Sequence, residues 1–358
     1  MELSYIKRTT NQESSSFELN DVSNYLKDGD AKIPVLEKNP FRHNDNDVFQ
    51  IFVCDNEDVI ASGFHFPTSL VIDGNEFESI TCSTLSVNTT HRKQGIGSKI
   101  HKLRMEHSKN GAILIGSVSQ MQYNIMQKLG AKLFFSPRLL LLKKSRAVVE
   151  MFCKGFIAKT VAFICNFFLL IQQLFIKLIA QINGQWKYEI YEVKEIDQEY
   201  ERIWNGDKAR FKENHNKEWA KWVLDSNKDC KLYYIKRKGE VIAWFIIKDQ
   251  FHEQASQRGF KNVTLRSIIE WETADIKKLS YFKICLFAMT LPGNIDAVEF
   301  VPFNKSLYKK MLFLGTVPMG KGNVVLRLSE NSPLREIEGI NDEENWRIRP
   351  AAGDNMLF

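Results

Sequence analysis

Short apolar runs separated by turn-forming residues fill the first part of the chain, a pattern that predicts paired strands. The predicted strands are residues 48–54, 59–72, 78–87, 112–116 and 139–142. Two stretches instead place apolar residues at helical spacing: the one that starts at Gly95, and Met121–Leu129, which Gly130 ends. Because strands first follow one another and then alternate with helices, we predict a mixed α/β (α+β) fold with helices flanking a twisted sheet.

The second part of the chain repeats features of the first at a nearly constant offset. The run Tyr123-x-x-Met126-x-x-Leu129-Gly130 recurs as Tyr308-x-x-Met311-x-x-Leu314-Gly315. Two further fragments, Val59-Ile-Ala and the strand ending at Val87, match Val241-Ile-Ala and Val263-Thr-Leu-Arg-Ser-Ile-Ile. Three matches at one offset predict two similar domains in tandem. We assign the first domain to residues 1–145, an apolar helical linker to 146–187, a degenerate second domain to 188–330 and a tail to 331–358.

The predicted linker contains a run without charge from Thr160 to Ile176. This run is shorter than the ~20 apolar residues that a bilayer requires, and it contains Asn166, Gln172 and Gln173. Three interpretations stay open, in decreasing order of support. The segment could be a buried helix between the domains, a helix lying on a membrane surface through residues 157–183, or a transmembrane span.

Composition narrows the class of protein. A chain of 358 residues is long enough for two domains, and 44% hydrophobic with 26% charged residues is typical of a soluble globular protein. The net charge of +6 mildly favours anionic partners such as nucleotide phosphates or a membrane surface, and it is too small to indicate nucleic acid.

Cysteine and histidine usage gives no sign of a metal site. The six cysteines have no Cys-x-x-Cys pair, and the seven histidines do not cluster, so we predict reduced thiols and no metal. The first eight residues lack the apolar stretch of a secretory signal. We therefore expect a cytoplasmic protein, with membrane association left open.

One turn carries the candidate chemistry. The strand Leu85-Ser86-Val87 leads through a basic turn to Gly95-x-Gly97 and then into a helix. Backbone N–H groups at such a turn, together with the positive end of the helix dipole, form a concave site for an anion. Glycine leaves the amides accessible to a phosphate. The second domain has Trp271-Glu-Thr-Ala-Asp at the matching place, so we predict one such site per chain.

The motif differs from two common phosphate-binding turns. A dinucleotide fingerprint needs glycine where Ile100 stands, and a P-loop needs a longer spacing before Gly-Lys-Ser/Thr. The pattern Arg92-x-x-Gly95-x-Gly97 after a Leu-x-Val strand instead resembles the acyl-CoA signature of the GNAT N-acetyltransferase superfamily. The resemblance covers about residues 45–145.

This resemblance implies acetyl-CoA or another acyl-CoA as cosubstrate and transfer of the acyl group to an amine. The backbone of Leu85, Ser86 and Val87 would hold the pantetheine arm and stabilise the thioester oxyanion. The pyrophosphate loop would consist of Arg92, Lys93, Gln94, Gly95, Ile96, Gly97 and Ser98. For the acceptor, a small-molecule amine is implied, and an amino sugar is our first guess.

The catalytic groups depart from the family pattern. Many relatives have an acidic tyrosine four residues before the glycine that matches Gly130, and here Met126 occupies that place. Tyr123 is the substitute acid that we name, although a packed core tyrosine explains it as well. For the base we name Glu78, with Glu76 beside it on the same strand, against the interpretation of exposed strand glutamates. Ser119 and Gln120 could contact the cofactor arm or cap a helix.

Two alternatives remain. Fem-type peptidyl transferases also pair two such domains but use aminoacyl-tRNA and do not need the glycine turn. A non-catalytic, membrane-associated GNAT-like binding protein would account for the missing tyrosine and the apolar linker. Within the basic cluster around the turn, Lys102 and Arg104 are predicted to lie on a solvated helix face.

Overall fold

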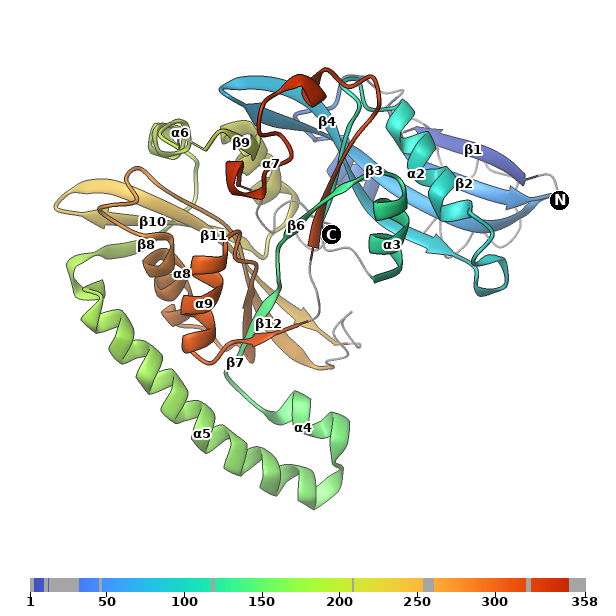
Figure 1. Cartoon of the computed structure of the whole chain (residues 1–358). Coiled ribbons are helices and arrows are strands. Elements are labelled where there is room, and N and C mark those ends of the chain that lie inside the picture. Colours follow the sequence, from blue (N-terminus) through green and yellow to red (C-terminus); the bar gives the residue numbers. More distant parts are fainter. Residues whose placement is uncertain are drawn as a thin grey trace. The chain divides into compact units, whose positions relative to one another are not determined.

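The computed structural model describes residues 3–9, 12, 32–44, 47–116, 120–207, 209–253, 261–319 and 323–347. The chain divides into two compact units, whose elements Figure 1 colours along the sequence. The first unit contains Met1–Phe135, Ala209–Ser226 and Asn323–Phe358, and the second contains Ser136–Lys208 and Asn227–Gly322. Each unit is therefore built from segments that are far apart in the sequence.

The first unit is organised around one sheet with the strand order β1-β2-β3-β4-β5-β15-β6. Neighbours along this path are antiparallel except β4 and β5, which are parallel. Two further strands extend it, since β9 pairs with β3 and β16 pairs with β9. The strands are β1 (Leu3–Thr9), β2 (Val48–Asp55), β3 (Asp58–Ile72), β4 (Asn75–Val87), β5 (Ala112–Ile115), β6 (Lys132–Phe135), β9 (Phe211–Glu213), β15 (Asn323–Leu328) and β16 (Trp346–Arg347).

Helices α2 and α3 cover one face of this sheet. Ile96 and Ile100 of α2 pack against β2 and β3, and Met126 of α3 is fully buried against β4, β5 and β15. Burial of these side chains removes apolar surface from water, which fixes both helices on the sheet. Residues 32–36 are helical, and the helical segments with printed bounds are η2 (Thr89–His91), α2 (Ile96–Glu106), α3 (Gln120–Lys128), α7 (Lys217–Ser226), η4 (Pro333–Glu336) and η5 (Glu343–Asn345).

The second unit has a sheet with the order β8-β10-β11-β12-β13-β7-β14. Its neighbours are also antiparallel except for one parallel pair, β12 and β13. Both sheets therefore follow the same order and sense of strands, and the mixed α/β fold predicted from the sequence is confirmed. The strands are β7 (Leu139–Leu142), β8 (Glu189–Val193), β10 (Cys230–Arg237), β11 (Glu240–His252), β12 (Val263–Thr273), β13 (Ala297–Phe300) and β14 (Val317–Pro318).

The core of the second unit surrounds helix α8. Residues Ile284–Met289 of this helix are almost completely buried and contact side chains of β11, β12 and β13. Helix α5 is the longest helix of the described chain and contributes Ile176 and Ala180 to the same core. The helical segments are α4 (Arg146–Phe152), α5 (Gly155–Ile182), η3 (Gln185–Lys187), α6 (Gln198–Asn205), α8 (Tyr281–Thr290) and α9 (Lys305–Phe313).

One predicted strand has a different partner from the one expected. Leu139–Leu142 was expected to complete the first domain at residues 1–145, but β7 pairs with β13 and β14 in the second sheet. In return, β15 lies between β5 and β6 of the first sheet. An apolar run such as Leu139-Leu-Leu-Leu can form a buried strand in either sheet. Its pattern therefore does not identify the strand with which it pairs. The described part of the tail also belongs to the first unit, where Trp346 is buried.

This exchange predicts that a side chain near the end of the sequence stabilises the first sheet. We expect Leu326→Ala in β15, where the side chain is 1% exposed, to cost about 2 to 5 kcal/mol of unfolding free energy. Hydrogen exchange should then accelerate at the amides of β5. Leu140→Ala in β7, equally buried, is the matched control and should instead accelerate exchange in β13. Faster hydrogen exchange in β13 for Leu326→Ala, or in β5 for Leu140→Ala, would contradict the assignment of β15 to the first sheet and β7 to the second.

Candidate functional site

The parallel strands β4 and β5 diverge soon after they pair. Their ladder runs from Ile80 opposite Ile113 to Cys82 opposite Ile115. Beyond Cys82, β4 continues to Val87 with β3 as its strand partner. The other edge of its last residues therefore faces no strand among the described parts of the chain. An unpaired strand edge can hold an extended ligand through backbone hydrogen bonds.

A β-bulge marks the point of divergence, and a buried arginine stabilises it. The register between β3 and β4 shifts so that Ser83 and Thr84 both stand opposite Phe64. Arg104 of α2 is fully buried, and its Nη2 donates to the carbonyl oxygens of Phe64, Ser83 and Thr84 at 2.6, 3.2 and 3.0 Å. Bulged carbonyls lack regular ladder partners, so these charge-assisted bonds satisfy them and attach α2 to the strand.

Arg104 corrects one expectation from the sequence. It was predicted to be solvated, yet it lies on the helix stripe of Ile96 and Ile100, at i, i+4 and i+8, which is the buried face. That spacing was the signal that the sequence analysis missed. Gly63 of β3 leaves room for the guanidinium, because a Cβ there would lie 2.7 Å from Arg104 Nη2. Lys102 is exposed, as predicted.

Between β4 and α2 the chain forms an exposed turn. Arg92 Nε donates to the Val87 carbonyl oxygen at 3.2 Å, and the Asn88 side chain accepts from Thr90 N at 3.3 Å. Lys93 and Gly95 adopt left-handed backbone conformations, with φ of 67° and 80°. Turns that contain such residues direct successive N–H groups outward and are typical of anion sites. The turn contains two exposed cationic residues, Arg92 and Lys93.

The turn ends at the N-terminus of α2, which has no side-chain cap. Lys99 N is the first to donate back along the helix, to Gly95 O at 3.0 Å. For the preceding N–H groups of Ile96, Gly97 and Ser98, the described residues supply no acceptor. These free donors coincide with the positive end of the helix dipole, so the position favours an anion such as a phosphate.

The two glycines have different roles. Gly95 is exposed, and its left-handed φ is what excludes most side chains, since a Cβ would meet nothing within 4 Å. Gly97 is buried, and a Cβ there would lie 3.3 Å from Ile125 Cδ1 and 3.5 Å from Leu85 Cδ2. Gly97 therefore allows α2 to approach α3 and β4 closely, in addition to any effect on a ligand.

The two candidate catalytic residues come from different elements around the parallel ladder. Tyr123 of α3 is half-buried and packs on the apolar cluster that contains Ile80, Cys82 and Ile115. Glu78 precedes the ladder, and its carboxylate accepts from Lys109 Nζ at 2.8 Å. Glu78 therefore lies at the end of the ladder away from Leu85–Val87, which continue toward the turn.

The other sequence candidates are only partly placed. Glu78 also lies 3.4 Å from His43 Nε2, and Glu76 accepts from Asn214 Nδ2 at 2.7 Å. Ser119 and the side chain of Gln120 lie outside the described residues. Among the described residues, no group of three or more His, Cys, Asp or Glu side chains is placed to hold a metal ion.

The opposite face of β4 carries a polar cluster that sequence analysis missed. Strand alternation directs Thr81 away from the helices, and it shares a hydrogen bond of 3.2 Å with Thr68. Glu213 and His215 line the same small pocket, with His215 Nε2 3.5 Å from the Glu213 carboxylate and both side chains buried. The His215 ring stacks on Trp219 at 3.9 Å. Residues 209–226 had been assigned to the second domain, so their place in this unit was not anticipated.

In the second unit, aromatic side chains occupy the corresponding divergence. Strands β12 and β13 pair only from Leu265 to Ser267, and beyond this Trp271 is fully buried and stacks on Phe303 at 6.1 Å. Tyr281 contacts the same ring and donates to Glu272 Oε1 at 3.0 Å. The described residues beyond this ladder thus include packed aromatic side chains, and the prediction of one site per chain stays a prediction.

Acid sensitivity is expected from a histidine beside the bulge. Burial, and then the charges of Arg104, His107 and Lys7, lower the pKa of His65 well below its ordinary value. The unfolded chain therefore binds the proton more readily, and stability falls as the pH drops below about 6.5. When the pH is lowered from about 7.5 to about 5.5, the unfolding free energy of the wild type should fall because of His65. In His65→Phe this fall should be smaller by about 1.4 kcal/mol.

Urea denaturation at both pH values measures this difference. His43→Gln is the control, because it removes an imidazole that is half-exposed and leaves the buried His65 site intact. Equal acid destabilisation of the wild type and His65→Phe would show that His65 is protonated in the folded state.

Comparison with known proteins bears on the fold. No protein-family model and no curated protein sequence matches the chain. Among solved structures, a GCN5-related N-acetyltransferase from Anabaena variabilis is similar with a TM-score of 0.52 and 10% identity, over 91% of this chain and 73% of that one. Saccharomyces cerevisiae N-myristoyltransferase with bound myristoyl-CoA also gives 0.52, with 12% identity over 90% of this chain and 82% of that one.

These similarities cover about nine tenths of the chain and so span both units. At such low identity they establish architecture, and the diverging strands and the turn before α2 are features of this chain itself. The chain has the fold of the GCN5-related N-acetyltransferases.

Proposed function

We propose that this protein is an N-acyltransferase that moves an acyl group from acyl-CoA to an amine. The observation that carries the proposal is the continuous path from the unpaired edge of β4 to the uncapped N-terminus of α2. The fold is shared with acetyl- and myristoyltransferases, one of which has myristoyl-CoA bound, and this supports the same class of donor.

In the proposed complex the pantetheine arm adds to the open edge of β4 like a short strand. Its amide groups pair with the backbone of Leu85–Val87, and the pyrophosphate accepts hydrogen bonds from the N–H groups at the start of α2. Arg92 and Lys93 add positive charge at the mouth of the turn. The thioester then lies near the bulge, where a backbone N–H of β4 stabilises the oxyanion that forms on attack.

The reaction that we propose is direct attack of a neutral amine on the thioester carbon. The new C–N bond forms, the C–S bond breaks, and the amine loses one proton while the CoA thiolate gains one. We propose the buried Glu213–His215 pair as the route for the first proton, because it lines the same small pocket as Thr81 in the middle of the ladder. Tyr123 is the proposed donor of the second. Glu78 is a weaker candidate base, since Lys109 and His43 already engage its carboxylate.

The acceptor is proposed as a small-molecule amine, with amino sugars the first class to test. The length of the acyl chain is a separate variable. We therefore propose that titrations include both acetyl-CoA and myristoyl-CoA.

Donor binding predicts a charge effect at Gly95. Asp and Asn both tolerate a left-handed backbone and have the same shape, so they differ there mainly in charge. We expect Gly95→Asp to weaken acetyl-CoA binding about ten-fold relative to Gly95→Asn, because the carboxylate repels the pyrophosphate. Isothermal titration calorimetry measures both dissociation constants. Absence of binding by the wild type to either acyl-CoA, or equal affinities for the two variants, would exclude the proposed donor site.

Proton transfer predicts a second effect. His215→Gln should lower kcat about 10²- to 10⁴-fold while leaving the dissociation constant for acyl-CoA unchanged. Glu213→Gln should shift the acidic limb of the pH profile, and Tyr123→Phe should slow loss of the thiolate. Release of CoA thiol in the presence of an amine gives the rates. If Glu78→Gln abolishes turnover and His215→Gln does not, the base is Glu78.

A further inference from the structure

Helix α5 runs along the second unit (Figure 1), and its buried residues are few. At 1.5 Å per residue its 28 residues span about 42 Å. Its buried positions are the small or branched side chains Ala158, Ala162, Ile176 and Ala180. The first two pack on Val149 of α4, and the last two join the core of the unit.

Three amide side chains in the middle of α5 bind the protein. Asn166 accepts from the backbone N–H of Ser145 at 2.8 Å. Gln172 donates to the carbonyl oxygens of Leu314 and Gly315 at 3.0 Å, and Gln173 donates to that of Lys143 at 2.9 Å. In the sequence these three side chains argued against a transmembrane segment. In the structure their hydrogen bonds attach one face of the helix to the second unit.

The outward face is entirely apolar over the central turns. More than half of each side chain is exposed for Phe163, Phe167, Phe168, Leu170, Leu174 and Leu178. Phe156 before them and Trp186 after them are 83% and 72% exposed. Large contiguous apolar surfaces of this kind are rare on soluble monomers and mark binding surfaces.

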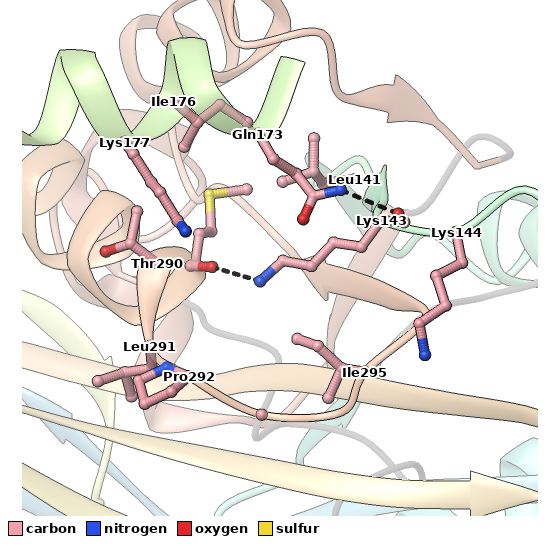
Figure 2. A pocket seen from close by; sticks show the side chains of 12 residues that line it. Leu141, Lys143, Lys144, Gln173, Ile176, Lys177, Thr290, Leu291, Pro292 and Ile295 are labelled. Carbon is pink, nitrogen blue, oxygen red and sulfur yellow. Dashed lines mark hydrogen bonds between the residues drawn. The ribbon is translucent and has the colours of Figure 1, made fainter. Parts of the chain in front are cut away.

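Positive charge follows one edge of this apolar face. Lys159 and Lys177 stand five helical turns apart, so they lie on the same line along α5. Figure 2 shows Lys177 beside Lys143 in a pocket of about 220 Å³. The Lys143 ammonium donates to the neutral Met289 carbonyl at 2.9 Å, whereas Lys144 pairs with Asp296 at 3.0 Å. Burial, and then the charges of Arg266 and Lys177, lower the pKa of Lys143 to about 8.

The charges and the hydrogen bonds of α5 favour a lipid surface over the other possible occupants of its apolar face. Between Lys143 and Lys187 the sequence has one acid, Glu150, and Arg146 pairs with it at 2.7 Å. A second copy of this face would bring lysines against lysines, which is repulsive. In the described part of the chain α5 is the one helix long and apolar enough to cross a bilayer, but crossing would break the bonds of Gln172 and Gln173.

We propose that α5 lies in the plane of an anionic lipid membrane, with its outward face among the acyl chains and Lys159, Lys177 and Lys143 beside headgroup phosphates. An amphipathic helix with an aromatic-rich apolar face and basic residues at its margin has the character of an interfacial anchor. The anchor belongs to the second unit, and it does not depend on acyl transfer in the first.

The test uses the full-length protein and vesicles of phosphatidylcholine with or without phosphatidylglycerol. Phe167→Glu should lower the partition coefficient about ten-fold or more, because it places a charge among acyl chains. Phe251→Glu in β11 is the matched control, since both phenylalanines are 60% exposed, and it should have no effect. Lys159→Gln should weaken binding about five-fold on anionic vesicles only.

Co-sedimentation gives the partition coefficients, and calorimetric titration of Phe167→Glu with acetyl-CoA separates the anchor from the donor site. Release of bound protein by alkaline carbonate is expected of an interfacial helix. The proposal is overturned by no binding to either vesicle, by equal binding of Phe167→Glu and wild type, or by resistance to carbonate, which would indicate a span. A dimer that Phe167→Glu dissociates, without vesicle binding, would assign the face to a second copy.

Discussion

The backbone pairing of β5 on both sides is the constraint on which the rest of the first unit depends. β5 contributes only four residues, and they hydrogen-bond to β4 on one edge and to β15 on the other. A buried strand that lacks one of these partners leaves N–H and C=O groups unsatisfied, at a cost of about 1 to 3 kcal/mol for each group. Because β15 holds β5 in place, it also fixes where the ladder with β4 ends. The gap beyond Cys82 is thus defined by a strand from the far end of the sequence.

The bulge in β4 and its surroundings form one electrostatic unit. Arg104 supplies a positive charge to three carbonyl oxygens in a region that excludes water. The same charge lowers the pKa of the neighbouring His65 and His101, although burial is the larger cause in both. Arg104 therefore both holds the backbone of the bulge and contributes to the lowered pKa of these two histidines.

Local patterns predicted elements well, and tertiary partners poorly. The strands over 48–54, 59–72 and 78–87 and the helix after Gly95 are present nearly as expected, because alternation and turn residues are local signals. The partner of Leu139–Leu142 was wrong, since an apolar strand fits either sheet. The place of Glu213 and His215 was missed for a related reason: their segment follows the second sheet's first strand in sequence but folds with the first sheet. The order of segments in the sequence does not indicate that a segment following β8 packs on the first sheet.

Because β7 joins the second sheet and β15 joins the first, the first sheet cannot be completed until β15 has been synthesised. When β6 ends at Phe135, the strand that must lie beside it at Asn323 has yet to be translated. At typical ribosome speeds the delay is about 10 to 40 seconds. During that interval the nascent first sheet has open edges between β5 and β6, which attract chaperones or other nascent chains. A chain that stopped before Asn323 would therefore lack β15, and the strands of the first sheet already made would miss the strand that pairs with both β5 and β6.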